Sequence, residues 1–123
     1  MTYREQEAID SLAPDQWEIF KAKIKAECEQ MASVTPIDFR YTDTSQSFAV
    51  ERFENGVALR ILRLRFDPAV PRIMWQCLDP SEKKGWITFQ HRGDRLFYVV
   101  DSRVVTDREL IQLLTMCLTG QLR

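Results

Sequence analysis

The sequence has few of the residues from which metal centres, phosphate-binding loops and disulfide frameworks are built. In 123 residues it contains one histidine, four glycines and three cysteines. Cys28, Cys77 and Cys117 are far apart and odd in number, so the sequence predicts neither a disulfide framework nor a Cys-x-x-Cys metal or redox motif. Their apolar surroundings predict buried, reduced thiols and hence a reducing, cytoplasmic setting.

Signatures of catalysis and of cofactor binding are also missing. His91 lies in a predicted hairpin turn, without the partners that a zinc site or a catalytic acid–base pair requires. The serines do not stand in a Gly-x-Ser-x-Gly motif, and the scattered glycines form no phosphate loop. The sequence therefore predicts no cofactor and no metal, and nothing in it supports an enzyme.

No apolar run approaches the ~20 residues of a membrane-spanning helix, and charged residues occupy the N-terminal segment where a signal peptide needs an apolar stretch. We therefore expect neither a membrane segment nor a secretory leader. The net charge of −1 argues against a general nucleic-acid binder. Hydrophobic residues at 45% and charged residues at 28% are typical of a globular protein, and the length suits a single domain over residues 1–123.

Two segments carry the spacing of three and four that is typical of an amphipathic helix. The first is predicted to begin at Pro14 and to stop before Pro36, because the residue before a proline favours extended geometry. Its apolar stripe consists of Trp17, Phe20, Ile24, Cys28 and Met31. The second opens with a capping box over residues 106–109 and ends at Gly120. Residues 1–12 lack a sustained pattern and are predicted to form a loosely ordered lead-in.

Between these segments, alternating apolar and polar residues predict about six strands. Asn55-Gly56 is the strongest short hairpin signal, and a two-residue loop there places Glu51 opposite Arg60. A later change in the phase of the alternation predicts a β-bulge near Ile61-Leu62. The expected fold is α+β: an N-terminal helix, an antiparallel meander sheet of about six strands and a C-terminal helix, with both helices on one sheet face.

The size, the mild acidity and the helix–meander–helix plan resemble the small acidic chaperones that hold type III secretion effectors. The sequence departs from those chaperones over residues 67–71, where they have a helix in the middle of the sheet that supports dimerisation. This chain reads Asp-Pro-Ala-Val-Pro there. The resemblance rests on architecture alone, and no sequence motif identifies a family.

The candidate interaction surface combines arginines of the central strands with two tryptophans. Its residues are Arg60, Arg63, Arg65, Arg72, Trp75 and Trp86. Arginine beside aromatic residues is typical of protein interfaces, of anion sites and of platforms for single-stranded nucleic acid. A solvated sheet surface with neighbouring carboxylates would equally account for the arginines, and core packing would account for the tryptophans.

Three functions fit these features. The first is a non-catalytic cytoplasmic interaction module of the small bacterial type, which binds another protein or forms a homodimer through its open sheet face or an edge strand. The second is a small-ligand or anion-binding domain, or an unrecognised enzyme, with a pocket between the sheet and the helices. The third is weak nucleic-acid binding through the arginine-rich sheet face, which the near-neutral charge disfavours.

Overall fold

The computed structural model describes residues 2–79 and 81–120. The elements follow one another as α1 (Tyr3–Val34), β1 (Asp38–Asp43), β2 (Ser47–Glu54), β3 (Val57–Asp67), β4 (Arg72–Asp79), β5 (Ser81–Arg92), β6 (Arg95–Val100), β7 (Arg103–Val105) and α2 (Asp107–Thr119). The strands form one seven-stranded sheet in the order β1 to β7, and each pairs antiparallel with its neighbours in the sequence. The predicted α+β meander is therefore confirmed, with one strand more than expected.

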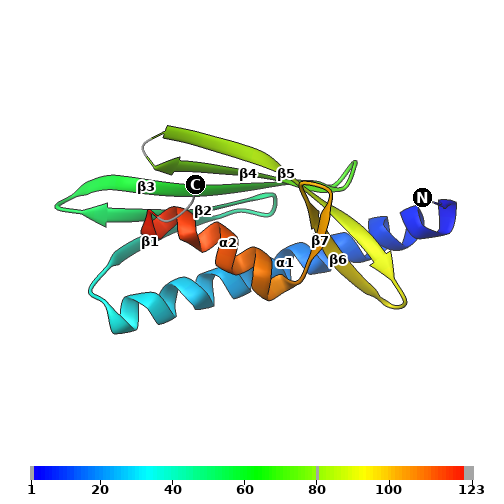
Figure 1. Ribbon diagram of the computed structural model, residues 1–123, viewed down its shortest axis with the longest axis horizontal. Helices are drawn as coiled ribbons and strands as arrows, with labels where there is room; N and C mark the ends of the chain where they lie inside the picture. Colours follow the sequence, from blue (N-terminus) through cyan, green and yellow to red (C-terminus); the bar gives the residue numbers. More distant parts are fainter. Residues whose placement is uncertain (1, 80, 121–123) are drawn as a thin grey trace.

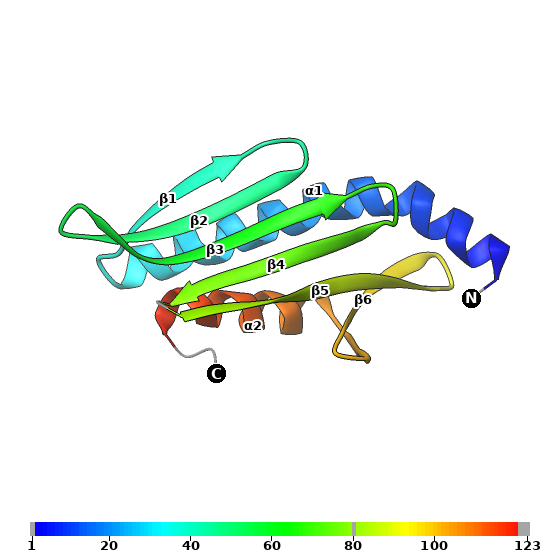
Figure 2. The ribbon, with the colours of Figure 1, turned by 90° about the horizontal axis from the view of Figure 1, so that it is seen from above.

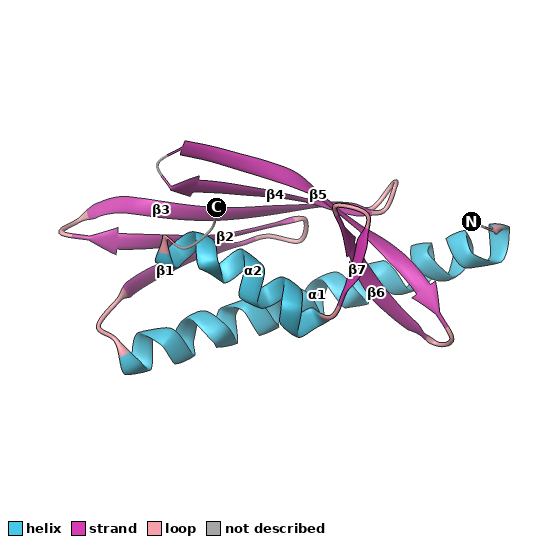
Figure 3. Ribbon diagram, in the orientation of Figure 1, coloured by secondary structure: helices cyan, strands magenta, loops and turns pink. Residues whose placement is uncertain are grey.

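Both helices lie on the same side of the sheet, as the two amphipathic stripes predicted (Figure 1). Colouring by secondary structure shows the two layers, and the hairpin of β6 and β7 bends toward the helices (Figure 3). The core fills the space between the layers and includes Phe20, Ile24, Leu62, Leu64 and Leu114. Within the described residues, no helix is both long and apolar enough to cross a membrane.

Helix α1 begins eleven residues earlier than the sequence predicted, because it starts at Tyr3 and continues through Pro14. The expectation of a loosely ordered lead-in was therefore wrong. Thr2 accepts a hydrogen bond from the backbone N–H of Glu5, whose side chain accepts one from the N–H of Thr2, so a capping box starts the helix. Ile9 is buried and extends the predicted apolar stripe toward the N-terminal end of α1. Its burial offsets the backbone hydrogen bond that Pro14 cannot donate.

The sheet departs from the predicted strands at its later turns. Strand β5 starts at Ser81 and pairs with β4 from the pair Asp79–Ser81 onward. Strand β7 was not predicted, because its three residues are too few to show an alternation. Residues 68–71 form the turn between β3 and β4, so no helix interrupts the sheet there.

The register of the β2–β3 hairpin also differs from the prediction. Glu51 pairs with Ile61 and Arg52 pairs with Arg60, whereas Glu51 was expected opposite Arg60. The irregularity lies between Arg52 and Phe53, nearer the turn than the predicted bulge. Because side chains alternate between the two faces, this shift turns Arg60 toward the helices and Ile61 away from them.

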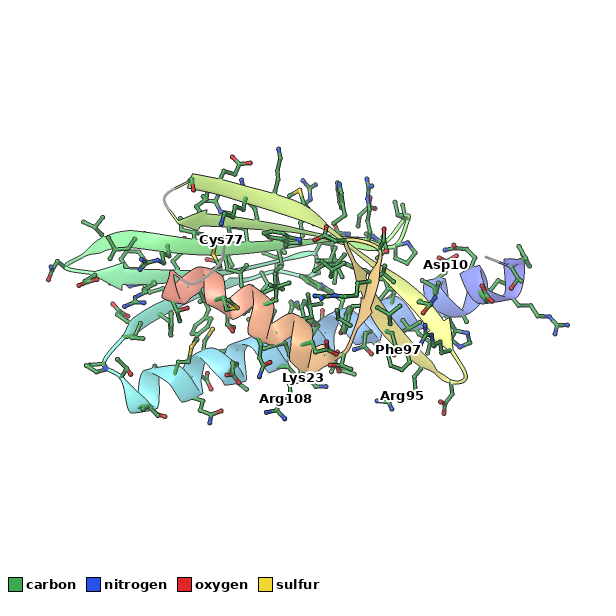
Figure 4. All side chains as sticks on the ribbon, viewed as in Figure 1. Asp10, Lys23, Cys77, Arg95, Phe97 and Arg108 are labelled. Atoms are coloured by element: carbon green, nitrogen blue, oxygen red, sulfur yellow. A yellow bond between two sulfur atoms is a disulfide. The ribbon has the colours of Figure 1, made fainter. Side chains whose placement is uncertain are left out.

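Cys77 and Cys117 form a disulfide that joins β4 to α2, so the prediction of three reduced thiols was wrong for these two residues. Figure 4 shows Cys77 on the sheet beside the C-terminal part of α2. Cys28 is a buried free cysteine, as predicted. The expected cytoplasmic setting rested on reduced cysteines, and the disulfide removes that support.

One buried charge fastens α1 to the turn between β1 and β2. Lys21 is only 4% exposed, and its ammonium group donates hydrogen bonds to Asp43 Oδ1 at 2.8 Å and to the Thr44 carbonyl at 3.0 Å. It also lies 3.1 Å from Glu18 Oε2. Burial lowers the pKa of Lys21, but the hydrogen bonds and charges of Asp43 and Glu18 outweigh it, so the pKa is raised.

Candidate functional site

The face of the sheet that the helices leave uncovered is the candidate site, and we call it the open face of β1–β5. Figure 2 is viewed onto this face, with the strands in front of both helices. The structure places Arg63, Arg65, Arg72 and Trp86 on it, because their positions alternate with buried residues of the same strands. It therefore brings together a large part of the predicted interaction surface.

The strand register aligns the side chains of the open face in rows. Moving from β2 to β5, one row contains Ser47, Arg65, Met74 and Trp86. From β1 to β5, the next contains Thr42, Ala49, Arg63, Gln76 and Lys84, and the one after it contains Arg40, Glu51, Ile61, Leu78 and Glu82. Directly opposite residues lie about 5 Å apart on one face, so each row is a continuous strip of side chains.

Two shallow hollows meet on this face. The first has a volume of about 260 Å³ and is lined by residues of β1 to β4, among them Ala49, Arg63 and Gln76. The second, of about 310 Å³, extends toward Trp86 and the turn after β3. Arg65 and Met74 line both, so the hollows join across the middle of the face. A partner would therefore meet an apolar floor with guanidinium groups standing beside it.

Trp86 and Arg72 form a stacked pair at one side of the face. Trp86 is 46% exposed, and the Arg72 guanidinium carbon lies 3.6 Å from the centre of its ring. Arg72 Nε is 3.8 Å from Asp67 Oδ2. A guanidinium over an indole is a favourable cation–π contact that also holds the ring in place. The exposed tryptophan is thus a pre-positioned contact surface of the kind that dominates interface energetics.

Some charges of the open face are paired within the chain and others are not. Arg40 lies 3.4 Å from Asp38, and Lys84 lies 3.6 Å from Glu82. In contrast, Glu51, Arg63 and Arg65 make no ion pair with any residue that the structure describes. Two guanidinium groups and one carboxylate are therefore available to a binding partner.

Arg60 and Trp75, which were predicted to belong to the interaction surface, lie on the face that the helices cover. Arg60 approaches the end of α2, where a Cβ on Gly120 would be only 2.7 Å from its guanidinium. Its neighbour Arg52 donates a hydrogen bond of 2.9 Å to the Leu118 carbonyl. Helix α2 has no basic residue in its last turn, so these arginines complement the negative end of its dipole.

Trp75 packs against the core opposite its cross-strand partner Gly85. A Cβ at position 85 would lie 2.8 Å from the Trp75 indole nitrogen. The Trp75 ring therefore occupies the space that the side chain of any residue other than glycine would fill. Trp75 is therefore a packing residue. Core packing was the alternative to an interaction surface that the sequence left open for the tryptophans.

A third hollow, away from the open face, lies between the two helices. It has a volume of about 530 Å³ and is lined by charged groups of both signs, among them Lys23 and Arg108, which Figure 4 labels beside α1 and α2. An ion pair of 2.7 Å between Lys23 and Asp107 crosses it. This hollow differs from the predicted pocket between sheet and helices, because residues of the two helices line it.

A hydrogen-bonded cluster beside this hollow joins α1, β6 and α2. Gln16 Nε2 lies 2.6 Å from the Tyr98 hydroxyl oxygen and 3.3 Å from Asp107 Oδ1. Burial raises the pKa of the Tyr98 phenol, and the Asp107 charge adds to the effect. Tyr98 is only 1% exposed, so its hydroxyl is closed to a substrate and holds three elements together. No set of three metal-ligating side chains gathers anywhere in the described residues.

The sequence reasoning missed the neutral part of the open face. Ala49, Ile61, Met74 and Leu78 all point away from the helices. The alternation within β4 did carry a signal, because Met74 and Leu78 occupy positions that alternate with buried Ile73 and with Cys77. Apolar residues thus occur on both faces of the strand, which is typical of a strand covered on both sides.

Comparison with protein-family models, with curated proteins and with solved structures found no match to this chain.

Proposed function

We propose that this protein is a non-catalytic interaction module that associates with a second copy of itself through the open face of its sheet. The observation that carries the proposal is the uncovered face itself, with its apolar floor and the stacked Trp86–Arg72 pair. An exposed apolar patch among charged groups is typical of protein interaction sites.

The size of the face supports this proposal. With strands about 4.8 Å apart and a rise of about 3.3 Å per residue, the paired part of β1–β5 covers roughly 550 Å² in projection. The accessible area of the protruding side chains exceeds the projection. A stable interface buries ~800 Å² on each partner, which is of the same order as this face.

The composition of the face disfavours the use of this surface for nucleic acid. Carboxylates share it with the arginines, since Asp38, Glu51, Asp67 and Glu82 belong to the same strands or their ends. A phosphate backbone would be repelled by them. A gel shift with single-stranded oligonucleotides that weakens steeply with added salt would favour that alternative.

Light scattering over a range of protein concentrations tests the proposal. We expect a concentration-dependent dimer, and we expect Ile61→Ser to raise its dissociation constant about tenfold or more, because Ile61 lies in the middle strand of the open face. Ile19→Ser is the matched control. It makes the same chemical change at a side chain that is 47% exposed on α1, and it should leave the dimer unchanged.

Two outcomes would overturn the proposal. The first is a wild-type protein that remains a monomer at all concentrations. The second is a dimer that Ile61→Ser and Ile19→Ser weaken equally. Circular dichroism of both variants checks that the fold is kept.

A further inference from the structure

The charges of the open face are separated along the direction of the strands. Near one end of the strands lie Arg63, Arg65 and Lys84, which we call the basic half. Toward the other end lie Asp38, Glu51 and Glu82, which we call the acidic half. Arg40 and Asp67 are the exceptions, and each is already paired within the chain, Arg40 with Asp38 and Asp67 with Arg72.

We propose that two copies pack open face on open face with their strands running in opposite directions, so that the basic half of each copy covers the acidic half of the other. This inference rests on the proposed function and adds the orientation and the contacts that determine it. A closed dimer of identical chains has a two-fold axis, and the same surface is then used twice.

The register identifies the two-fold axis that suits these charges. Arg63 and Ile61 occupy neighbouring rows of β3, and Glu51 is the partner of Ile61 on β2. An axis across the strands between these rows places Ile61 of one copy over Arg63 of the other. Glu51 of the first copy then lies one strand away from Arg63 of the second, within reach of its long side chain.

The competing two-fold axis runs along the strands and keeps their direction. It would lay the basic half of one copy on the basic half of the other. Like charges brought together at an interface oppose association, so this arrangement is disfavoured.

The unpaired groups require such a partner. Covering Glu51 and Arg63 without an opposite charge would bury ions that have no ion pair among the described residues, and an unpaired buried charge strongly opposes association. The reversed arrangement instead supplies a carboxylate for Arg63 twice, once on each side of the axis.

Charge reversal tests the orientation. Arg63→Glu should weaken self-association because it faces Glu51 of an identical copy, and Glu51→Arg should weaken it because it faces Arg63. When the two variants are mixed, every contact across the axis between position 51 of one chain and position 63 of the other is attractive. We expect the mixed dimer to form about tenfold or more in preference to either variant's own dimer. Double-mutant cycles on close charge pairs at protein interfaces measure coupling of at least this size.

Native mass spectrometry of the mixture, with one variant isotopically labelled, measures the three dimers directly. Arg108→Glu on α2 is the control for a charge change away from the open face, and in its mixture with Glu51→Arg the mixed dimer should not be favoured over the Arg108→Glu variant's own dimer. If Ile61→Ser weakens the dimer but the mixture of Arg63→Glu and Glu51→Arg shows no preference for the mixed dimer, the orientation is refuted. The proposed function then still stands. A wild-type protein that stays monomeric would refute both.

Discussion

Reduction of the Cys77–Cys117 disulfide should destabilise the fold strongly. The bond joins residues 40 positions apart in the sequence and ties α2 to β4. In the chain-entropy description, a loop of that length confines the unfolded chain by about 4 kcal/mol. The free energy of unfolding should therefore fall by about 2–4 kcal/mol when the bond is reduced, since residual structure in the unfolded state lessens the entropic effect.

Urea unfolding followed by tryptophan fluorescence, with and without a phosphine reductant, measures this difference. For a chain of this size the denaturant dependence is about 1.5 kcal/mol per molar urea, so the midpoint should shift by roughly 1.3–2.7 M. Cys28→Ala provides the control. It removes the thiol that takes no part in the bond, so reductant should shift its midpoint by the same amount.

Thiol counting provides the refuting result. Denatured, unreduced protein should present one reactive thiol, that of Cys28, because Cys77 and Cys117 are joined. Three reactive thiols, or a urea midpoint that ignores reductant, would show that the bond does not hold α2 to the sheet.

Two further perturbations follow from buried groups. Burial, with the neighbouring charges of Glu27 and Glu29, raises the pKa of the Cys28 thiol to about 12 from an ordinary value of 9.0. The stability that this neutral thiol provides is complete below pH 9 and is lost between pH 9 and about 12, by up to about 1.4 kcal/mol per pH unit, because only the unfolded chain ionises there. Chemical denaturation between pH 8 and 10 should show this slope developing in the wild type, and a slope smaller by up to one proton in Cys28→Ala. Gly85→Ala should lower the free energy of unfolding by about 1–3 kcal/mol, since the new methyl group would meet the Trp75 ring; an unchanged thermal midpoint would contradict that packing.

Periodicity was sufficient to predict the class of fold and the order of its main elements. Spacing of three and four marked both helices, and alternation with turn residues marked a meander, which the structure confirms. The start of α1 could also have been found, because Thr2 and Glu5 have the spacing of a capping box. Pro14 obscured it, since proline suits the first turn of a helix better than its interior.

The disulfide could not be predicted in the same way. Cys77 and Cys117 become neighbours only when α2 packs on β4, and no local pattern encodes that contact. Three cysteines with wide spacing are consistent with free thiols or with one bond plus a free thiol. The choice between these two depends on tertiary packing, as does the placing of Trp75 against Gly85.

The position of one strand irregularity decides the composition of the candidate site. In the predicted register Glu51 would face Arg60, and the two would neutralise each other within one chain. In the structure the shift beside Phe53 turns Arg60 toward the end of α2 and leaves Glu51 opposite Ile61. Arg60 thus complements the negative end of α2, which lies more than fifty residues later in the chain. The open face loses this arginine as a result. The shift also leaves Glu51 without an ion pair among the described residues, and this is the carboxylate that the proposed dimer pairs with Arg63 of a second copy.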